Sequence, residues 1–357
     1  MITVTKSFLP DFGTYQSYLQ QVWASGWITN NGPLVQRLEE ELKSYLRVKH
    51  LFFTSNGTIA LQIALKALRL SGEIITTPFS YVATTNSILW ENCTPVFADI
   101  DPNDLNISPT ALTDLITDKT RAILATHVYG HPCAVEEIEN IALRHDLRVI
   151  YDGAHAFGAK YMDSSVLSFG DIATCSFHAT KIFHTVEGGA VITNDDELAE
   201  RIMLCRQFGH IGDEYYNVGI NGKNSEIHAA MGLSILPQMD EIIKERMKLS
   251  DAYDRYLDGV GLCKPKARQG TLYNFAYYPI IFESEEQLLR SKDYLSNCGI
   301  YTRRYFYPSL NRLPFLEGQC CPVSESVSSR VLALPLYVGL KEGQIGMICD
   351  YLQKSLR

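Results

Sequence analysis

Strand-length apolar runs alternate with helix-length amphipathic segments between residues 50 and 195. The runs predict buried strands at 50–54, 73–77, 94–98, 121–126, 147–151, 172–177 and 189–193. Between them, apolar residues recur with the period of a helix at 59–70, 81–91, 134–145 and 196–208. This alternation of strand and helix predicts a mostly parallel sheet that is covered by helices on both faces.

The pattern changes after about residue 225. A long helical segment at 225–257 is followed by strands near 273–282, a helix near 285–297 and a last helix at 343–356. We therefore predict a large domain over residues 1–240 and a small α+β domain over residues 241–357, with the N-terminal segment as a candidate to dock on the small domain. In open parallel sheets, ligands bind beyond the carboxyl ends of the strands, so residues at those ends are the candidates for chemistry.

Composition limits the classes of partner. The chain has 357 residues, of which 46% are hydrophobic and 20% are charged, as in ordinary soluble proteins. Its net charge of −8 argues against a nucleic-acid partner but allows a small anionic ligand, which a few N–H groups and one or two cations can bind. The nine cysteines include no CxxC pair, which indicates free thiols in a reducing compartment, and we predict no metal site. Because the sequence has no signal-peptide segment and no apolar run long enough to span a bilayer, we expect a cytoplasmic protein without membrane contact.

The turn at residues 55–58 joins the first predicted strand to a helix that begins at Ile59. Gly57 permits close approach of the backbone, and Thr58 is expected to cap the helix. The N-terminus of such a helix is a natural anion site. An ordinary capped turn explains the same residues, and taken alone it is the better explanation.

Asp152 ends the apolar run at 148–151 and is followed by a Gly-Ala-His sequence that includes His155. A carboxylate at the end of a buried strand is desolvated and needs a cationic partner to stay ionised. The protonated ring nitrogen of pyridoxal phosphate (PLP) is such a partner, and this pairing makes PLP an effective electron sink. The alternative role for Asp152 is a helix N-cap, and the alternative for His155 is a hydrogen-bonded core histidine.

Lys181 follows the predicted strand at 172–177 and precedes a Gly pair that is typical of a tight turn. Burial against apolar strands would lower the pKa of its amine and let it act as a nucleophile or a base. A lone lysine is far more often a solvated surface charge. The combination favours function, because the anion-binding turn, Asp152 and Lys181 are predicted at one edge of one sheet and match the phosphate, ring nitrogen and aldehyde of PLP.

Ordered motifs along nearly the whole chain resemble the DegT/DnrJ/StrS family of nucleotide-sugar aminotransferases, a branch of the PLP enzymes of fold type I. Each motif is weak singly, but the set is highly specific. The resemblance implies an aspartate-aminotransferase-like α/β fold, with a mostly parallel sheet in the large domain and a small C-terminal α+β domain. The motifs occupy residues 27–33, 56–61, 78–84, 127–130, 152–156, 176–181, 187–189, 219–221, 225–226 and 334–337.

The resemblance also assigns roles to individual residues. It implies that the catalytic residues are Lys181, which forms the covalent link to PLP, and Asp152, which pairs with the ring nitrogen. His155 corresponds to a position near the 3′ oxygen of the cofactor, and Tyr81 to an aromatic residue that stacks on its ring. One branch of the family, the sugar dehydratases, replaces the lysine with histidine. Because Lys181 is retained here, a transaminase is the better prediction.

The phosphate of the cofactor is expected to bind between two subunits. Asn221 matches an asparagine that reaches the phosphate of the neighbouring subunit's cofactor, which implies a homodimer with a shared active site. Asn56 and Gly153 depart from the usual residues of the family, but both are small positions beside the motifs. The residues of the same chain that match the phosphate cradle are Gly57, Thr58 and Ser176.

Two clusters are candidate substrate contacts. In the small domain, Arg303, Arg304 and Tyr307 lie in one basic and aromatic run, and a guanidinium there can donate two hydrogen bonds to phosphate oxygens. A strand end with a structural ion pair explains this run equally well. Thr29 and Asn30 lie where the chain either lines the substrate entrance or docks the N-terminal helix.

The expected reaction transfers an amino group from L-glutamate to C4 of a dTDP-linked 4-keto-6-deoxyhexose. The product would be of the dTDP-4-amino-4,6-dideoxyglucose type, which serves amino-sugar and O-antigen (lipopolysaccharide) biosynthesis. The resemblance at residues 176–183 and 221–223 supports this choice within the family. Amination of C3 of an isomeric 3-keto sugar and a UDP-linked substrate are the alternatives. A non-catalytic regulatory protein is a hypothesis of another class, and the intact Lys181 and Asp152 argue against it.

Overall fold

Seven strands form the central sheet of the computed structural model, which describes residues 1–316 and 318–357. Their order across the sheet is β2-β10-β9-β6-β5-β3-β4. β10 runs antiparallel to both of its neighbours, and the other adjacent pairs are parallel, which confirms the predicted mostly parallel sheet. The strands are β2 (His50–Thr54), β3 (Glu73–Thr76), β4 (Thr94–Phe97), β5 (Thr120–Thr126), β6 (Arg148–Asp152), β9 (Ile172–Ser176) and β10 (Gly189–Thr193).

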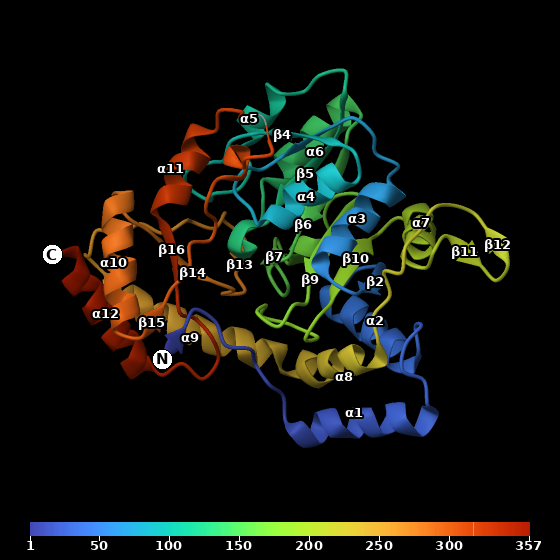
Figure 1. Cartoon of the computed structure of the whole chain (residues 1–357), viewed down its shortest axis with the longest axis horizontal. Coiled ribbons are helices and arrows are strands. Elements are labelled where there is room, and N and C mark those ends of the chain that lie inside the picture. Colours follow the sequence, from blue (N-terminus) through green and yellow to red (C-terminus); the bar gives the residue numbers. More distant parts are fainter. Residues whose placement is uncertain (317) are drawn as a thin grey trace.

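Helices cover both faces of this sheet (Figure 1). Neighbouring residues of one strand point to opposite faces, so Ile74 and Ile75 of β3 belong to different hydrophobic clusters. Because both faces are buried, the strands are continuous apolar runs rather than alternating ones. One face is covered by α3 (Gly57–Ala67), α4 (Val82–Trp90) and α7 (Asp196–Arg206), and the other by α2 (Pro33–Leu46), α6 (Val135–His145) and α8 (Glu226–Ile235).

A second core lies in the C-terminal part of the chain. Its antiparallel pair of strands is β14 (Tyr278–Ile281) and β16 (Val331–Leu334), and its main helices are α9 (Met239–Leu257), α10 (Glu285–Asn297) and α12 (Glu342–Leu356). Helix α9 contributes Ile242 to the first core and Leu249 to the second. We therefore propose that the domain boundary lies near residue 240, where the sequence pattern predicted it.

Two expectations for the C-terminal part were wrong in detail. The helical segment at 225–257 is interrupted by a 3-10 turn at Leu236–Gln238, because Pro237 lacks the N–H that a continuous α-helix needs. The predicted strand near 273–282 is shorter, since residues 273–277 form a loop between β13 (Thr271–Leu272) and β14. That loop enters the site described below.

The first residues of the chain cross from one domain to the other and are called here the N-terminal strap (residues 2–8). In the small domain, β1 (Ile2–Thr3) pairs in parallel with β15 (Ile300–Tyr301). The Ser7 hydroxyl then donates to the carbonyl of Ala179 at 2.6 Å, and His184 Nε2 lies 2.7 Å from the carbonyl of Phe8. In Figure 1 the strap is the blue segment that runs from β15 to α1 (Phe12–Ser25).

The remaining strands and α-helices are short. They are α5 (Pro109–Thr113), β7 (Lys160–Tyr161), β8 (Ser164–Ser165), β11 (His210–Ile211), β12 (Glu214–Tyr215) and α11 (Pro322–Arg330). The β11–β12 hairpin lies at the end of the molecule opposite the small domain (Figure 1). None of the helices in the described ranges is long and apolar enough to cross a bilayer.

Candidate active site

A cavity of about 300 Å³ opens at the carboxyl edge of the central sheet. The large domain contributes the turn after β2, the start of α4, the ends of β6 and β9, and the lysine loop (residues 177–188). The small domain contributes Tyr277, Arg303, Tyr305 and Phe306. The cavity therefore lies between the domains, at the position where open parallel sheets bind ligands.

The turn after β2 begins helix α3 and borders the cavity. Asn56 is the N-cap, because its Oδ1 accepts a hydrogen bond from the N–H of Ile59 at 2.8 Å. The expectation that Thr58 caps the helix was wrong, since the helix already begins at Gly57. The N–H groups of Gly57 and Thr58 thus belong to the first turn, which leaves them without partners inside the helix. A Cβ on Gly57 would lie 2.9 Å from the Cβ of Ser176, so glycine allows the end of β9 to close this cradle.

Asp152 ends β6 with its side chain in the cavity wall and only 5% exposed. Its Oδ2 accepts from the Thr84 hydroxyl at 2.7 Å, and its Oδ1 accepts from the N–H of Ala154 at 3.0 Å. No helix begins after Asp152, so the helix N-cap alternative does not apply. Burial raises the pKa of Asp152, while the hydrogen bonds from Thr84 and Ala154 and the nearby charge of Lys181 act in the opposite direction.

Lys181 extends into the same cavity from the lysine loop. The loop is held by hydrogen bonds from the N–H of Ala179 to the carbonyl of Val186 at 2.7 Å and from the N–H of Lys181 to the carbonyl of His178 at 2.8 Å. The amine lies 3.5 Å from the hydroxyl of Tyr277. Burial lowers the pKa of Lys181, and the Asp152 carboxylate partly opposes this effect. A larger fraction of neutral amine is therefore available than on a solvated lysine.

His155 is buried beside the cavity, and its ring stacks on Phe306 with the ring centroids 5.5 Å apart. Its Nδ1 accepts from the N–H of Tyr129 at 3.2 Å. Burial lowers the pKa of His155 well below its ordinary value, so the ring is neutral and carries its proton on Nε2. His155 is thus a core histidine that also presents a donor toward a ligand.

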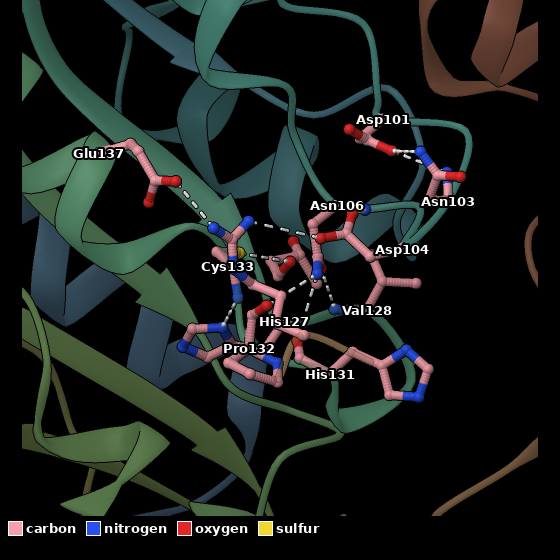
Figure 2. A network of polar contacts seen from close by, with 12 residues as sticks. Asp101, Asn103, Asp104, Asn106, His127, Val128, His131, Pro132, Cys133 and Glu137 are labelled. Carbon is pink, nitrogen blue, oxygen red and sulfur yellow. Dashed lines mark hydrogen bonds and ion pairs between the residues drawn. The ribbon is translucent and has the colours of Figure 1, made fainter. Parts of the chain in front are cut away.

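A polar network fixes the segment that supplies the Tyr129 N–H (Figure 2). Asn106 accepts from the N–H of Val128 at 2.9 Å and donates to the carbonyl of Pro132 at 3.1 Å. His127 Nδ1 accepts from the N–H of Cys133 at 3.0 Å. Burial lowers the pKa of His127 to about 4, so this acceptor is retained at neutral pH.

The other predicted site residues are divided between the cavity and its surroundings. Tyr81, at the start of α4, lines the cavity, as does Arg303, whose guanidinium lies 4.9 Å from the ring centre of Tyr305. Arg304 instead donates to Glu285 at 2.6 Å in an ion pair. The predicted residues that do not line the cavity are Thr29, Asn30, Asn221, Arg304 and Tyr307.

Sequence reasoning missed two polar groups next to the proposed catalytic residues. Thr84 donates to Asp152, and its hydroxyl is also 2.8 Å from that of Ser80. A sequence signal for Thr84 was present, because it lies three residues after Tyr81, the N-cap of α4, and therefore one helical turn further on. Tyr277 faces Lys181 from the small domain, 96 residues along the chain. No local pattern marks Tyr277, because the domain packing alone brings it to the site.

The positions of the cavity residues match the phosphate, the ring nitrogen and the aldehyde of PLP. The cradle of Gly57, Thr58 and Ser176 offers N–H and hydroxyl donors to a phosphate. Each oxygen of Asp152 has a single hydrogen-bond donor among the described residues, which leaves a lone pair for a protonated ring nitrogen. The Lys181 amine shares this space. This fold and this cavity define a PLP-dependent enzyme of fold type I.

Comparison with known proteins identifies the family within that class. Residues 13–353 match the DegT/DnrJ/EryC1/StrS aminotransferase family, and the chain belongs to it. It is 41% identical to the dTDP-4-amino-4,6-dideoxy-D-glucose transaminase of Shigella dysenteriae, over 100% of this chain and 98% of that protein. Its identity to the Escherichia coli transaminase of the same name is 40%, over 96% and 95% of the two chains. A solved structure of DesI in the presence of its TDP-sugar product has a TM-score of 0.95 and 32% identity, over 100% of this chain and 93% of the other.

Proposed function

We propose that the enzyme transfers the amino group of L-glutamate to C4 of a dTDP-linked 4-keto-6-deoxyhexose and forms a dTDP-4-amino-4,6-dideoxyglucose-type product. The observation that carries the proposal is the 41% identity over the whole chain to a dTDP-4-amino-4,6-dideoxy-D-glucose transaminase. C3 amination of a 3-keto isomer and a UDP-linked substrate remain alternatives to test. Supply of an amino sugar for O-antigen assembly would follow from the proposed product.

The proposed roles follow from where the side chains lie. PLP, when bound, withdraws the electron pair from the substrate carbon that loses its proton. Asp152 would hold the ring nitrogen protonated, and the donor on His155 Nε2 would orient the cofactor. The neutral amine of Lys181 would take the proton from the substrate carbon and return it to the cofactor or the product. Tyr81 would pack against the cofactor ring.

Arg303 is the candidate for an anionic group of the substrate. It lines the cavity and has no carboxylate within ion-pair distance among the described residues, whereas Arg304 is engaged by Glu285. Its place above the ring of Tyr305 leaves the guanidinium edge available for two parallel hydrogen bonds to a carboxylate or a phosphate.

We further propose that the active unit is a homodimer. Asn221 is exposed and does not line the cavity of its own chain, which is compatible with a contact to the neighbouring subunit. Large apolar side chains are also exposed on α1 and around the β11–β12 hairpin, such as Trp23 at 72% and Val218 at 72%. Surface of this kind commonly marks an interface. If sites are shared, Asn221→Ala alone should lose most of its activity, and an equal mixture with Lys181→Ala should recover about a quarter of the native activity after subunit exchange. If sites are not shared, Asn221→Ala should stay active by itself and the mixture should show about half of the native activity.

The reaction is tested by incubating the PLP-loaded enzyme with glutamate and a panel of dTDP- and UDP-linked 3-keto and 4-keto sugars. NMR of the products then identifies the nucleotide, the aminated carbon and the stereochemistry. Amination of only the dTDP-4-keto sugar supports the proposal, and exclusive amination at C3 refutes the regiochemistry. Lys181→Ala is the control for enzyme-dependent turnover. A protein that takes up no PLP would instead favour a regulatory role.

A further inference from the structure

We propose that the hydroxyl of Tyr277 is a positioning group for the Lys181 amine. It would hold the amine in both of its protonation states whenever the lysine is not linked to the cofactor. The inference rests on the role proposed above for Lys181. Tyr277 comes from the small domain, outside every motif that carried the family resemblance, and it approaches Lys181 only through the packing of the two domains.

The contact between the two side chains is specific. The distance from Nζ to Oη is 3.5 Å, and neither atom makes another hydrogen bond within the described ranges. Rotation within the flexible lysine side chain can shorten this outer-limit contact into a normal hydrogen bond. Both residues also line a narrow second cavity between the lysine loop and residues 276–277.

A hydroxyl suits this position because it can reverse its role. When Lys181 is protonated, its ammonium donates to Oη of Tyr277, and when the amine is neutral, the Tyr277 hydroxyl donates to Nζ. Burial raises the pKa of Tyr277, so its proton stays on Oη throughout. The proton that moves to and from the substrate carbon therefore remains on Lys181, and Tyr277 only orients the lone pair or the N–H bonds.

The backbone that carries Tyr277 is anchored by a buried cation. Arg246 of α9 donates from Nε to the carbonyl of Phe275 at 2.7 Å and from Nη2 to the carbonyl of Ala276 at 2.6 Å. It has no carboxylate within ion-pair distance in the described part of the chain, so its hydrogen-bonding capacity is directed to this loop. Residues 275 and 276 directly precede Tyr277, and their position sets where its ring begins.

Two further contacts tie the same loop to the cavity wall. Asn274 is fully buried and donates to the carbonyls of His155 at 2.8 Å and Phe157 at 2.9 Å. The Tyr273 hydroxyl is 3.1 Å from the carbonyl of Tyr277 itself. The ring of Tyr277 also packs edge-on against His155, with ring centroids 4.8 Å apart. These contacts fix the position of the Tyr277 hydroxyl relative to both the lysine loop and His155.

The test uses Tyr277→Phe, which keeps the ring and removes only the hydroxyl. PLP is added to the apoenzyme over a range of pH values, and the growth of visible absorbance reports the rate at which the neutral Lys181 amine reacts. A hydrogen bond to the ammonium is stronger than one to the neutral amine, so its loss should lower the pH of half-maximal uptake by about one unit. The deuterium isotope effect with α-deuterated glutamate should also increase, because an unoriented amine slows the proton transfer.

Tyr278→Phe is the matched control. Tyr278 is the next residue, but its hydroxyl donates to Asp254 in the small domain and does not line the cavity. This variant should keep the native pH midpoint and isotope effect. An unchanged or raised midpoint in Tyr277→Phe, with native-like circular dichroism, overturns the inference.

Failure of the proposed function is recognised separately. Borohydride reduction of the native enzyme followed by peptide mapping should place the PLP label on Lys181. A label on another residue refutes the role of Lys181 and with it the inference. A label on Lys181 together with an unchanged Tyr277→Phe profile refutes only the role of Tyr277.

Discussion

Replacing Asp152 with asparagine should separate the chemistry of the site from the stability of the fold. The amide has nearly the same shape as the carboxylate but cannot pair as an anion with the ring nitrogen. Removing one partner of a buried ion pair costs about 3 kcal/mol or more. If this energy is lost from the transition state, the rate falls at least about 100-fold. We therefore expect the reaction of the bound cofactor with glutamate to slow by this factor.

The apoenzyme of Asp152→Asn should be at least as stable as the wild type. The hydroxyls of Thr84 and Ser80 form a chain that can reverse, so the new amide N–H can donate to Thr84 while its oxygen still accepts from Ala154. The pKa of Asp152 is higher in the folded protein than in the unfolded chain, so between these two pKa values the folded protein binds more protons. The free energy of unfolding of the wild type therefore decreases as the pH rises through this interval. Asparagine does not ionise, so Asp152→Asn does not lose this stability at neutral pH.

The assay is a single turnover in which excess glutamate is mixed with PLP-loaded enzyme and the loss of visible absorbance is followed. Urea unfolding of both apoenzymes at pH 7 provides the stability comparison. The reasoning is refuted if Asp152→Asn reacts within about threefold of the native rate, since an ion pair with the cofactor ring cannot be worth so little. A large drop in apoenzyme stability would instead contradict the reversible hydroxyl chain.

Three further predictions concern buried polar groups. Glu226 is 2% exposed and accepts hydrogen bonds from two backbone N–H groups at the start of α2, at 2.8 and 2.9 Å. Glu226→Gln should therefore lower the free energy of unfolding, measured in urea, by about 1–3 kcal/mol. The control Glu197→Gln, at an exposed residue, should change it by less than about 0.5 kcal/mol. His127 is neutral in the folded protein, where its pKa is about 4, whereas the unfolded chain takes up a proton near pH 6.5. As the pH falls from about 6.5 to 4, the free energy of unfolding of the wild type should therefore decrease by on the order of 3 kcal/mol more than that of His127→Asn. Equal decreases for the two proteins would contradict this. Arg206 and Glu39 form an ion pair with side-chain exposures of 4% and 13%. Arg206→Met leaves Glu39 without its partner and should lower the free energy of unfolding by about 3–5 kcal/mol in the same urea assay. The double variant Arg206→Met/Glu39→Gln should regain part of this loss.

The central sheet and the proposed catalytic residues could be predicted because their signals are local. Buried parallel strands are continuous apolar runs, and a residue that follows such a run, as Asp152 and Lys181 do, lies at the ligand-binding edge. The start of α3 was misplaced by two residues, since both Asn56 and Thr58 can cap a helix and periodicity does not choose between them.

The contributions of the small domain could not be predicted in the same way. Arg303 lines the cavity while the adjacent Arg304 is used by Glu285, and the sequence gives both the same chemistry. Tyr277 lies in a segment predicted as a strand, yet the carbonyls bound by Arg246 make it a loop that points its hydroxyl at the lysine. Such contacts depend on how two domains pack, which no local pattern records.

The N-terminal strap has a consequence for the order in which the chain becomes structured during synthesis. Ile2 is made about 300 residues before its partner Ile300. The strap therefore stays unpaired while the large-domain sheet can already assemble around it. Ser7 and Phe8 also bind the lysine loop, so the strap that holds this loop is anchored at its other end only after residue 300 has been made. Any chain fused ahead of Ile2 would have to be accommodated while this late pairing forms.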